Sequence, residues 1–391
     1  PLNGTHHYIF SVIPMEAQLT AIAASALLGV VVVLVVTNLM MSRRGFGIFP
    51  KEVGLRFIIM AVIFYIIVSV QGAMQAQMAL NQLIHFTDWV VAHSHLAMLG
   101  FATFAGIGGI NHAWQRMPDA RYNAKALNWA YWLLLLGISA MMIDLTIAGV
   151  LQGQMWQSSV PWIESVRASE PYWVVRVLTA VPITLGFVLI LVGLTTGPRG
   201  AGRQAVEKAL VEKPVDEVSP TALSGDSGST TAGRGLVMAY VVASVAGIGF
   251  FVLSVSLLGV WPSKVLAEQS AAMAPSAPLP LTAAEERGRL VYAREGCAYC
   301  HTQQIRYLDQ DINRFGAPTL AWESRFDYPH MMGTRRIGPD LSRASGTRTE
   351  NWHFVHLFAP RSVVPLSIMP SYAALFDGSP ERPTQEARDL I

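Results

Sequence analysis

Two cysteines and a histidine form the motif with the clearest chemistry in this sequence. They are Cys297, Cys300 and His301, in the order Cys-Ala-Tyr-Cys-His, and the chain has no other cysteine. At this spacing both thiols can bond to the two vinyl groups of a haem while the adjacent imidazole reaches the iron. A redox-active cysteine pair or half of a zinc site is the alternative, but zinc would need a second pair of ligands. We therefore predict covalent haem c at Cys297 and Cys300, with His301 as an iron ligand.

The haem iron needs a sixth ligand, and the candidates are methionines. Met369 lies in Ser367-Ile-Met-Pro, where the proline stiffens the loop that presents the thioether. A Met/His pair raises the reduction potential and suits electron transfer. Met331 and Met332 are rivals, but we expect Met369 to be the ligand.

The segment from Arg335 to Leu341 is expected to support this haem. A backbone carbonyl of this segment would orient the His301 ring. Its two arginines, Arg335 and Arg336, would meet haem propionates, or alternatively lie in solvent. The remaining histidines of this part, His330, His353 and His356, are expected to be structural.

A second group of histidines, His93 and His95, lies inside a long apolar stretch. Residues two apart on an α-helix point to opposite sides, because each residue turns the helix by about 100°. The two imidazoles could therefore each bind a different haem, but not one metal together. Ionisable residues within a membrane are costly and usually functional, although hydrogen bonding to backbone carbonyls is the alternative.

A third signal is the pair His6 and His7, just before the first apolar stretch. Adjacent imidazoles at a chain turn can converge on one copper ion. The pair alone is weak evidence, but we expect it to lie at the same membrane depth as His93 and His95.

The elements that position these residues are membrane helices. Hydrophobic residues make up 52% of the 391 and charged residues only 14%, against about a quarter charged in soluble domains. Six stretches are long enough for a bilayer, which takes about 20 helical residues: 16–41, 54–80, 89–113, 125–151, 171–196 and 235–260. The net charge of +2, without a basic patch, indicates no nucleic-acid partner.

The predicted fold is all-α, a polytopic transmembrane bundle with one further anchor helix and a small cytochrome c domain. We expect the bundle over residues 1–197, a flexible cytoplasmic linker over 198–234 and the anchor over 235–261. A second linker would cover 262–281 and the monohaem cytochrome c domain 282–391. The low-complexity run from Ser224 to Gly233 favours a flexible joint.

The charges of the loops predict which way the bundle faces. Basic residues gather in alternate loops, including Lys51, Arg116, Arg121 and Arg199, and the positive-inside rule places those loops in the cytoplasm. With six spans, residues 1–15 and the C-terminal domain would then lie in the periplasm, with the chain in a bacterial inner membrane.

The chain resembles the C-family, cbb3-type haem–copper cytochrome c oxidases. Gly4-Thr-His-His-Tyr8 and the stretch Asn81-Gln-Leu-Ile-His-Phe-Thr-Asp-Trp89, leading into His93-Ser-His95, resemble the catalytic subunit. The stretches Arg294–His301, Arg336–Leu341 and Arg361–Pro370 resemble the monohaem cytochrome c subunit. The resemblance covers nearly the whole chain and implies a fusion of the two subunits near 198–234.

The resemblance implies a role for each residue. His6 and His7 would be two of three copper ligands, His93 the proximal ligand of the high-spin haem b3, and His95 a ligand of the low-spin haem b. Electrons would pass from haem c through haem b to the haem b3–copper centre, where O2 is reduced to water with proton translocation. Implied partners are the membrane, other oxidase subunits including a dihaem cytochrome c, and soluble cytochrome c or a quinol-oxidising complex as electron source.

The sequence departs from this family in ways that keep alternatives open. The chain starts at Pro1 and lacks the upstream region in which the family has a third copper histidine, a cross-linked tyrosine and the other low-spin haem ligand, so we expect a fragment. Gln71 stands where the family usually has a glutamate. Because an amide does not titrate, a nitric oxide reductase-like enzyme is an alternative, and a non-catalytic membrane-anchored cytochrome is another.

Overall fold

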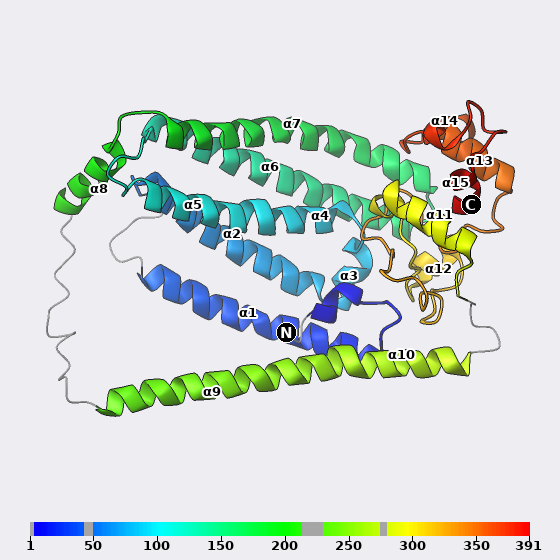
Figure 1. The fold of residues 1–391 in the computed structure, drawn as a ribbon, viewed down its shortest axis with the longest axis horizontal. Coiled ribbons are helices and arrows are strands. Elements are labelled where there is room, and N and C mark those ends of the chain that lie inside the picture. Colours follow the sequence, from blue (N-terminus) through cyan, green and yellow to red (C-terminus); the bar gives the residue numbers. More distant parts are fainter. Residues whose placement is uncertain (1–3, 43–49, 213–229, 274–279) are drawn as a thin grey trace.

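The computed structural model describes residues 4–42, 50–212, 230–273 and 280–391, and every regular element in these ranges is a helix (Figure 1). Six helical stretches are long and apolar enough to cross a membrane: Met15–Met41, Val53–Gln75, Asp88–Trp114, Ala124–Gln157, Trp162–Thr195 and Val237–Ala272. The predicted all-α, multi-pass membrane fold is therefore confirmed.

The first five spans form the bundle. Its helices are α1 (Met15–Ser42), α2 (Val53–Gln75), the short α3 (Met78–Ile84), α4 (Asp88–His95), α5 (Thr103–Trp114), α6 (Ala124–Gln157) and α7 (Trp162–Thr195). A π-helical segment, Leu96–Ala102, joins α4 to α5. The sixth span runs through α9 (Thr230–Val255), a π-helical segment at Ser256–Val260, and α10 (Trp261–Ala272).

The core of the bundle forms where α2, α5 and α6 meet around aromatic rings. Phe57, Phe104 and Tyr131 are almost fully buried, and Phe57 packs edge-on against Tyr131 with ring centroids 5.1 Å apart. Two glycines let α6 approach the segment that carries the histidines. A Cβ at Gly149 would lie 2.0 Å from the backbone nitrogen of Trp89, and one at Gly153 would lie 2.1 Å from the Leu83 carbonyl oxygen. Small residues on α6 thus set the position of α4.

The C-terminal part is small and mostly irregular. It contains α11 (Ala283–Arg294), a 3-10 turn at Cys297–Tyr299, α12 (Asp309–Phe315), α13 (Glu350–Phe358), α14 (Pro360–Val363) and α15 (Gln385–Leu390). Val291, Phe354, Phe376 and Ala387 belong to its small apolar core.

Several predicted boundaries are wrong. α2 ends at Gln75 rather than near 80, because Gln77 adopts an extended conformation and the Asn81 side chain donates to the freed Gln75 carbonyl at 3.1 Å. α7 begins at Trp162 rather than 171, since the helix continues through Pro171. The anchor helix continues to Ala272, into the predicted second linker.

The predicted cytoplasmic linker is partly helical, because α8 covers Ala201–Glu212. The low-complexity run expected to be flexible falls mainly on 213–229, outside the described residues.

The helix ends sort into two groups. In Figure 1 the C-terminal domain lies at one end of the bundle, beside the start of α7 and the α3 region, while α8 lies at the other end. The backbones of the basic residues Arg121 and Arg199 pair in an isolated antiparallel β-bridge at that far end. These two basic residues therefore lie on the opposite side of the bundle from the C-terminal domain.

Candidate redox sites

The Cys-Ala-Tyr-Cys-His motif follows α11 through a tight turn. Gly296 has φ +73°, a conformation that favours glycine, and it places Cys297 at the start of a single 3-10 turn. The backbone N–H groups of Cys300 and His301 both donate to the Cys297 carbonyl, at 3.1 and 3.0 Å. Both thiols are free and partly buried, and burial raises the pKa of Cys297 to about 11. The turn thus presents two uncharged thiols next to one imidazole.

The His301 ring is held from two sides by the segment 338–339. Its Nδ1 lies 2.7 Å from the Pro339 carbonyl oxygen, as predicted, which leaves Nε2 for a metal. Gly338 lies flat against the ring, since a Cβ there would be 2.2 Å from His301 Cε1. Burial lowers the pKa of His301, and the hydrogen bond to Pro339 opposes this shift. A neutral, oriented imidazole is what haem iron requires.

Met369 lies in a loop tied to its own neighbours. Its backbone N–H donates to Ser367 Oγ at 3.2 Å, and the Ser367 carbonyl accepts from Arg361 Nε at 3.0 Å. Its rival Met332 has its carbonyl bonded to the Gln303 N–H at 2.9 Å. Hydrogen bonds to backbone groups hold both loops. Met369 as the iron ligand stays a prediction.

His93 and His95 have different surroundings on α4. The His95 Nδ1 lies 2.8 Å from the Val91 carbonyl oxygen, one turn back, so its Nε2 is left for a ligand. The His93 ring stacks on Trp89, with centroids 5.9 Å apart, and its buried Nδ1 has no partner among the residues that the structure describes. A Cβ at Gly72 of α2 would lie 3.4 Å from His93 Cε1. The π-helical segment follows directly after His95, and such widened turns are frequent at functional sites.

His6 and His7 lie on a 3-10 turn, Gly4–Tyr8, with their Nε2 atoms 3.0 Å apart. The His6 Nδ1 is 2.6 Å from Ser25 Oγ on α1. Burial, then His7 and then His93, lower the pKa of His6 to about 4, so His93 is close enough to act on the pair. Two neutral, convergent imidazoles fit copper as two of its ligands. Within the described ranges, no group of three His, Cys, Asp or Glu side chains is arranged to hold a metal ion.

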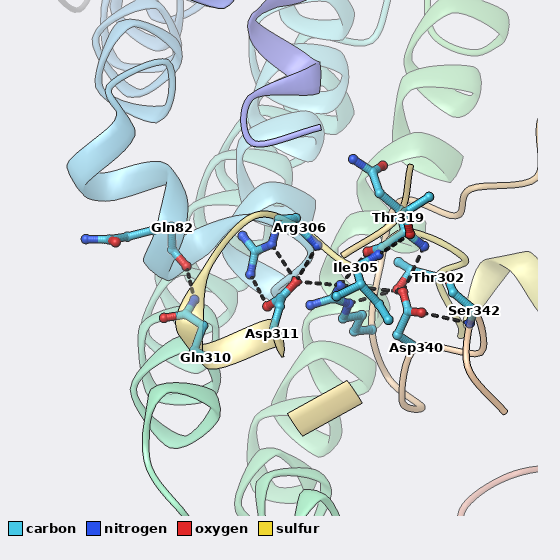
Figure 2. Close-up of polar contacts among 11 residues, drawn as sticks. Gln82, Thr302, Ile305, Arg306, Gln310, Asp311, Thr319, Asp340 and Ser342 are labelled. Atoms are coloured by element: carbon cyan, nitrogen blue, oxygen red, sulfur yellow. Dashed lines mark hydrogen bonds and ion pairs between the residues drawn. The ribbon is translucent and has the colours of Figure 1, made fainter. Parts of the chain in front are cut away.

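Sequence reasoning missed a buried charge cluster between the two parts (Figure 2). Arg306 and Arg336 both pair with Asp311, at 2.9 and 2.8 Å, and all three are almost fully buried. Burial favours the neutral acid, but the two guanidinium groups outweigh it and hold the pKa of Asp311 well below its usual range. Both arginines lie over the Phe86 ring, with guanidinium carbons 5.3 and 4.7 Å from its centroid.

The expectation that Arg335 and Arg336 could lie in solvent is therefore wrong. Arg336 is 3% exposed, and Arg335 pairs with Asp88, whose carboxylate is fully buried in the bundle. No pattern in the sequence indicates these partners, because each lies far away in the chain. Beside them His85 is half-buried and stacks on Phe86 with ring centroids 4.1 Å apart. Burial first, then Arg306 and Arg336, hold the pKa of His85 well below its usual value.

The bundle and the C-terminal domain define this molecule as a multi-pass membrane protein with a cytochrome c-type motif at one end. Residues 1–182 match the family described as Cytochrome C and Quinol oxidase polypeptide I. Residues 237–388 match the family described as Cytochrome C oxidase, mono-heme subunit/FixO. Two successive segments of the chain are thus similar to two different oxidase subunit families.

Known proteins with similar sequences give the same indication as the first family match. The bacteroid cytochrome c oxidase subunit 1 homolog of Bradyrhizobium diazoefficiens is 28% identical over 44% of this chain and 33% of its own length. The Cbb3-type cytochrome c oxidase subunit CcoN1 of Stutzerimonas stutzeri is 27% identical over 45% of the chain and 39% of its own length. A nitric oxide reductase subunit of Stutzerimonas stutzeri is 30% identical over 24% of the chain and 20% of its own length. The chain therefore spans well under half the length of these relatives.

Proposed function

We propose that this chain is part of a cbb3-type cytochrome c oxidase in which the catalytic and monohaem subunits are fused. Cys297, Cys300, His301 and Met369 would hold haem c, and His95 and His93 would bind the low-spin and high-spin haems. His6 and His7 would hold copper with a third ligand from outside these residues. When bound, these groups supply one-electron transfer and the reduction of O2 to water.

One observation carries the proposal: the domain with the Cys-Ala-Tyr-Cys-His motif is docked on the end of the bundle where α4 begins. Arg335 of that domain pairs with Asp88, the first residue of α4, and His93 and His95 lie on the same helix. The Nε2 atoms of His6 and His7 lie 3.0 Å apart, and His93 is close enough to lower the pKa of His6. A carrier domain and a candidate acceptor site thus share one interface.

The residues around each site have defined tasks in this proposal. Pro339 and Val91 accept from the Nδ1 atoms of His301 and His95, which fixes both rings and leaves Nε2 for iron. Trp89 and Gly72 flank the His93 ring, so it has little freedom to turn. Basic loops on the far side would face the cytoplasm, and the cytochrome domain would face the periplasm.

A nitric oxide reductase-like activity is the second candidate, and Gln71 favours it. The buried Gln71 Oε1 has no partner in the described part of the chain, and the next residue, Gly72, lies beside the His93 ring. An amide here cannot take up or release a proton, so chemistry that needs a carboxylate would be altered. Consumption of O2 and of nitric oxide by the same membranes would separate the two activities.

The haem content of variants tests the proposal. Pyridine haemochrome spectra of membranes containing the protein should show b-type haem together with haem c. His93→Ala and His95→Ala should each remove part of the b-type haem and leave haem c unchanged. Ser94→Ala is the matched control, because this exposed side chain between them only donates to Val90. If only haem c appears and the two histidine variants match the wild type, the bundle binds no haem and the chain is a tethered cytochrome.

A further inference from the structure

The five residues Arg335–Pro339, here called the coupling strap, touch both parts of the molecule. At one end the strap holds the motif histidine: the Pro339 carbonyl accepts from His301 Nδ1, and Gly338 packs against the ring. The Gly338 N–H also donates to the Cys300 carbonyl at 2.8 Å. The last two strap residues therefore belong to the candidate haem c site.

The first three strap residues contact the bundle instead. The Arg336 N–H donates to the Phe86 carbonyl at 3.0 Å, and the Ile337 carbonyl accepts from Trp162 Nε1 at 3.1 Å. The Arg335 guanidinium pairs with the Asp88 carboxylate. Consecutive residues thus reach the α3–α4 loop, α7 and the first turn of α4.

Asp88 makes this contact more than a surface ion pair. Its carboxylate is fully buried and also accepts from Gln152 Nε2 at 2.6 Å and from Trp173 Nε1 at 2.7 Å. The three partners come from the strap, α6 and α7. Removing one partner of such a buried pair leaves an uncompensated charge and is strongly destabilising, whereas exposed pairs contribute little. The strap is therefore attached to the bundle through a buried ion pair, whose loss would be costly.

We propose that the coupling strap fixes the cytochrome domain against α4, with Arg335 as the positioning residue. It sets the separation between the haem ligand His301 and the helix that carries His93 and His95. This inference rests on the proposed electron transfer between the two sites. The chain connection through α10 keeps the domain tethered without the strap, but a tether alone does not fix an orientation.

The inference predicts a local effect that a general loss of folding would not produce. In Arg335→Gln the Arg336 amide, which bonds to the bundle, should exchange its hydrogen roughly tenfold to a hundredfold faster than in the wild type. The Gly338 amide, which bonds within the domain, should keep its protection. Residue-level hydrogen exchange on the intact, haem-loaded membrane protein would measure both.

Electron transfer gives the second measurement. Rapid reduction followed by stopped-flow spectroscopy should show slower transfer from haem c to b-type haem in Arg335→Gln, with unchanged haem c content and reduction potential. Arg335→Lys keeps the charge and should restore most of the rate. Arg325→Gln is the control, because Arg325 is exposed and its guanidinium lies over the Phe326 ring of its own domain. Trp162→Phe, which removes the N–H that bonds to Ile337 but keeps an aromatic ring, should slow transfer less.

The outcomes separate this inference from the proposed function. If the wild type shows no b-type haem, or no transfer to it, the proposed function fails. If the wild type transfers electrons and Arg335→Gln does so at the same rate with the Arg336 amide still protected, the strap does not position the domain. Equal loss of protection at Arg336 and Gly338 would also overturn the inference, since it would indicate domain unfolding.

Discussion

The cytochrome domain and the bundle build their candidate ligand sites in opposite ways. In the domain, both cysteines and His301 lie within five residues, and a single segment, 338–339, orients the ring. In the bundle, His6 and His93 are brought together from an N-terminal turn and a helix far along the chain. His301 has its Nδ1 paired, whereas the His93 Nδ1 has no partner within the described residues. A local motif has its ligands close together in the sequence, whereas a site assembled from several helices forms only when those helices pack together.

The largest expected effect is the loss of covalent haem c when the cysteines of the local site are replaced. Cys297→Ala removes one of two thioether bonds, and Cys297→Ala with Cys300→Ala should abolish covalent haem c completely, because no other cysteine exists. Haem staining of denatured protein on a gel would measure this loss. The b-type haem of the bundle should remain. Its disappearance together with haem c would contradict the independence of the two sites.

A smaller effect is expected from crowding the ring in the local site. Gly338→Ala places a Cβ 2.2 Å from His301 Cε1, so the ring or the strap must shift. Overpacking of this kind costs about 1–3 kcal/mol of stability. We expect a lower thermal midpoint for the domain and a shifted haem c reduction potential, measured by calorimetry and redox titration. An unchanged potential would mean that the ring contact does not control the ligand.

The wild-type protein is expected to respond to pH only in acid, through the charge cluster between the regions. The folded-state pKa of Asp311 lies below its ordinary value, so its ionised form stabilises the fold above about pH 4 and this contribution is lost as pH falls further. The domain should therefore lose stability in acid below that range, as chemical denaturation at stepped pH would show.

Asp311→Asn supplies the control for this pH dependence. The variant leaves Arg306 and Arg336 without their carboxylate and should cost about 3–5 kcal/mol at neutral pH, since it breaks a buried pair, and less in acid, where the wild type loses the same contribution. Its acid sensitivity should be weaker than that of the wild type. Identical acid profiles would show that another carboxyl group is responsible.

The sequence by itself determined the elements and the local site. Apolar stretches identified all six spans, because a bilayer demands about 20 apolar residues in a row. The spacing of Cys297, Cys300 and His301 predicted the haem motif. The segment from Arg335 to Leu341 was expected to supply a backbone carbonyl to His301, and the Pro339 carbonyl confirms this. Helix ends were less predictable: the apolar stretch begins at 171, yet α7 begins at Trp162 and continues through Pro171.

Only the tertiary structure decided how the two regions meet. The sequence pattern places Asp88 before an apolar stretch and Arg335 near a haem or in solvent, but the two form one buried pair. Arg306, Asp311 and Arg336 likewise had no pattern that named them as partners. Sequence periodicity indicates which residues avoid water, but it does not say which buried charge faces which. That choice follows from the approach of α4 to α6 through Gly149 and from the docking of the domain on the bundle end.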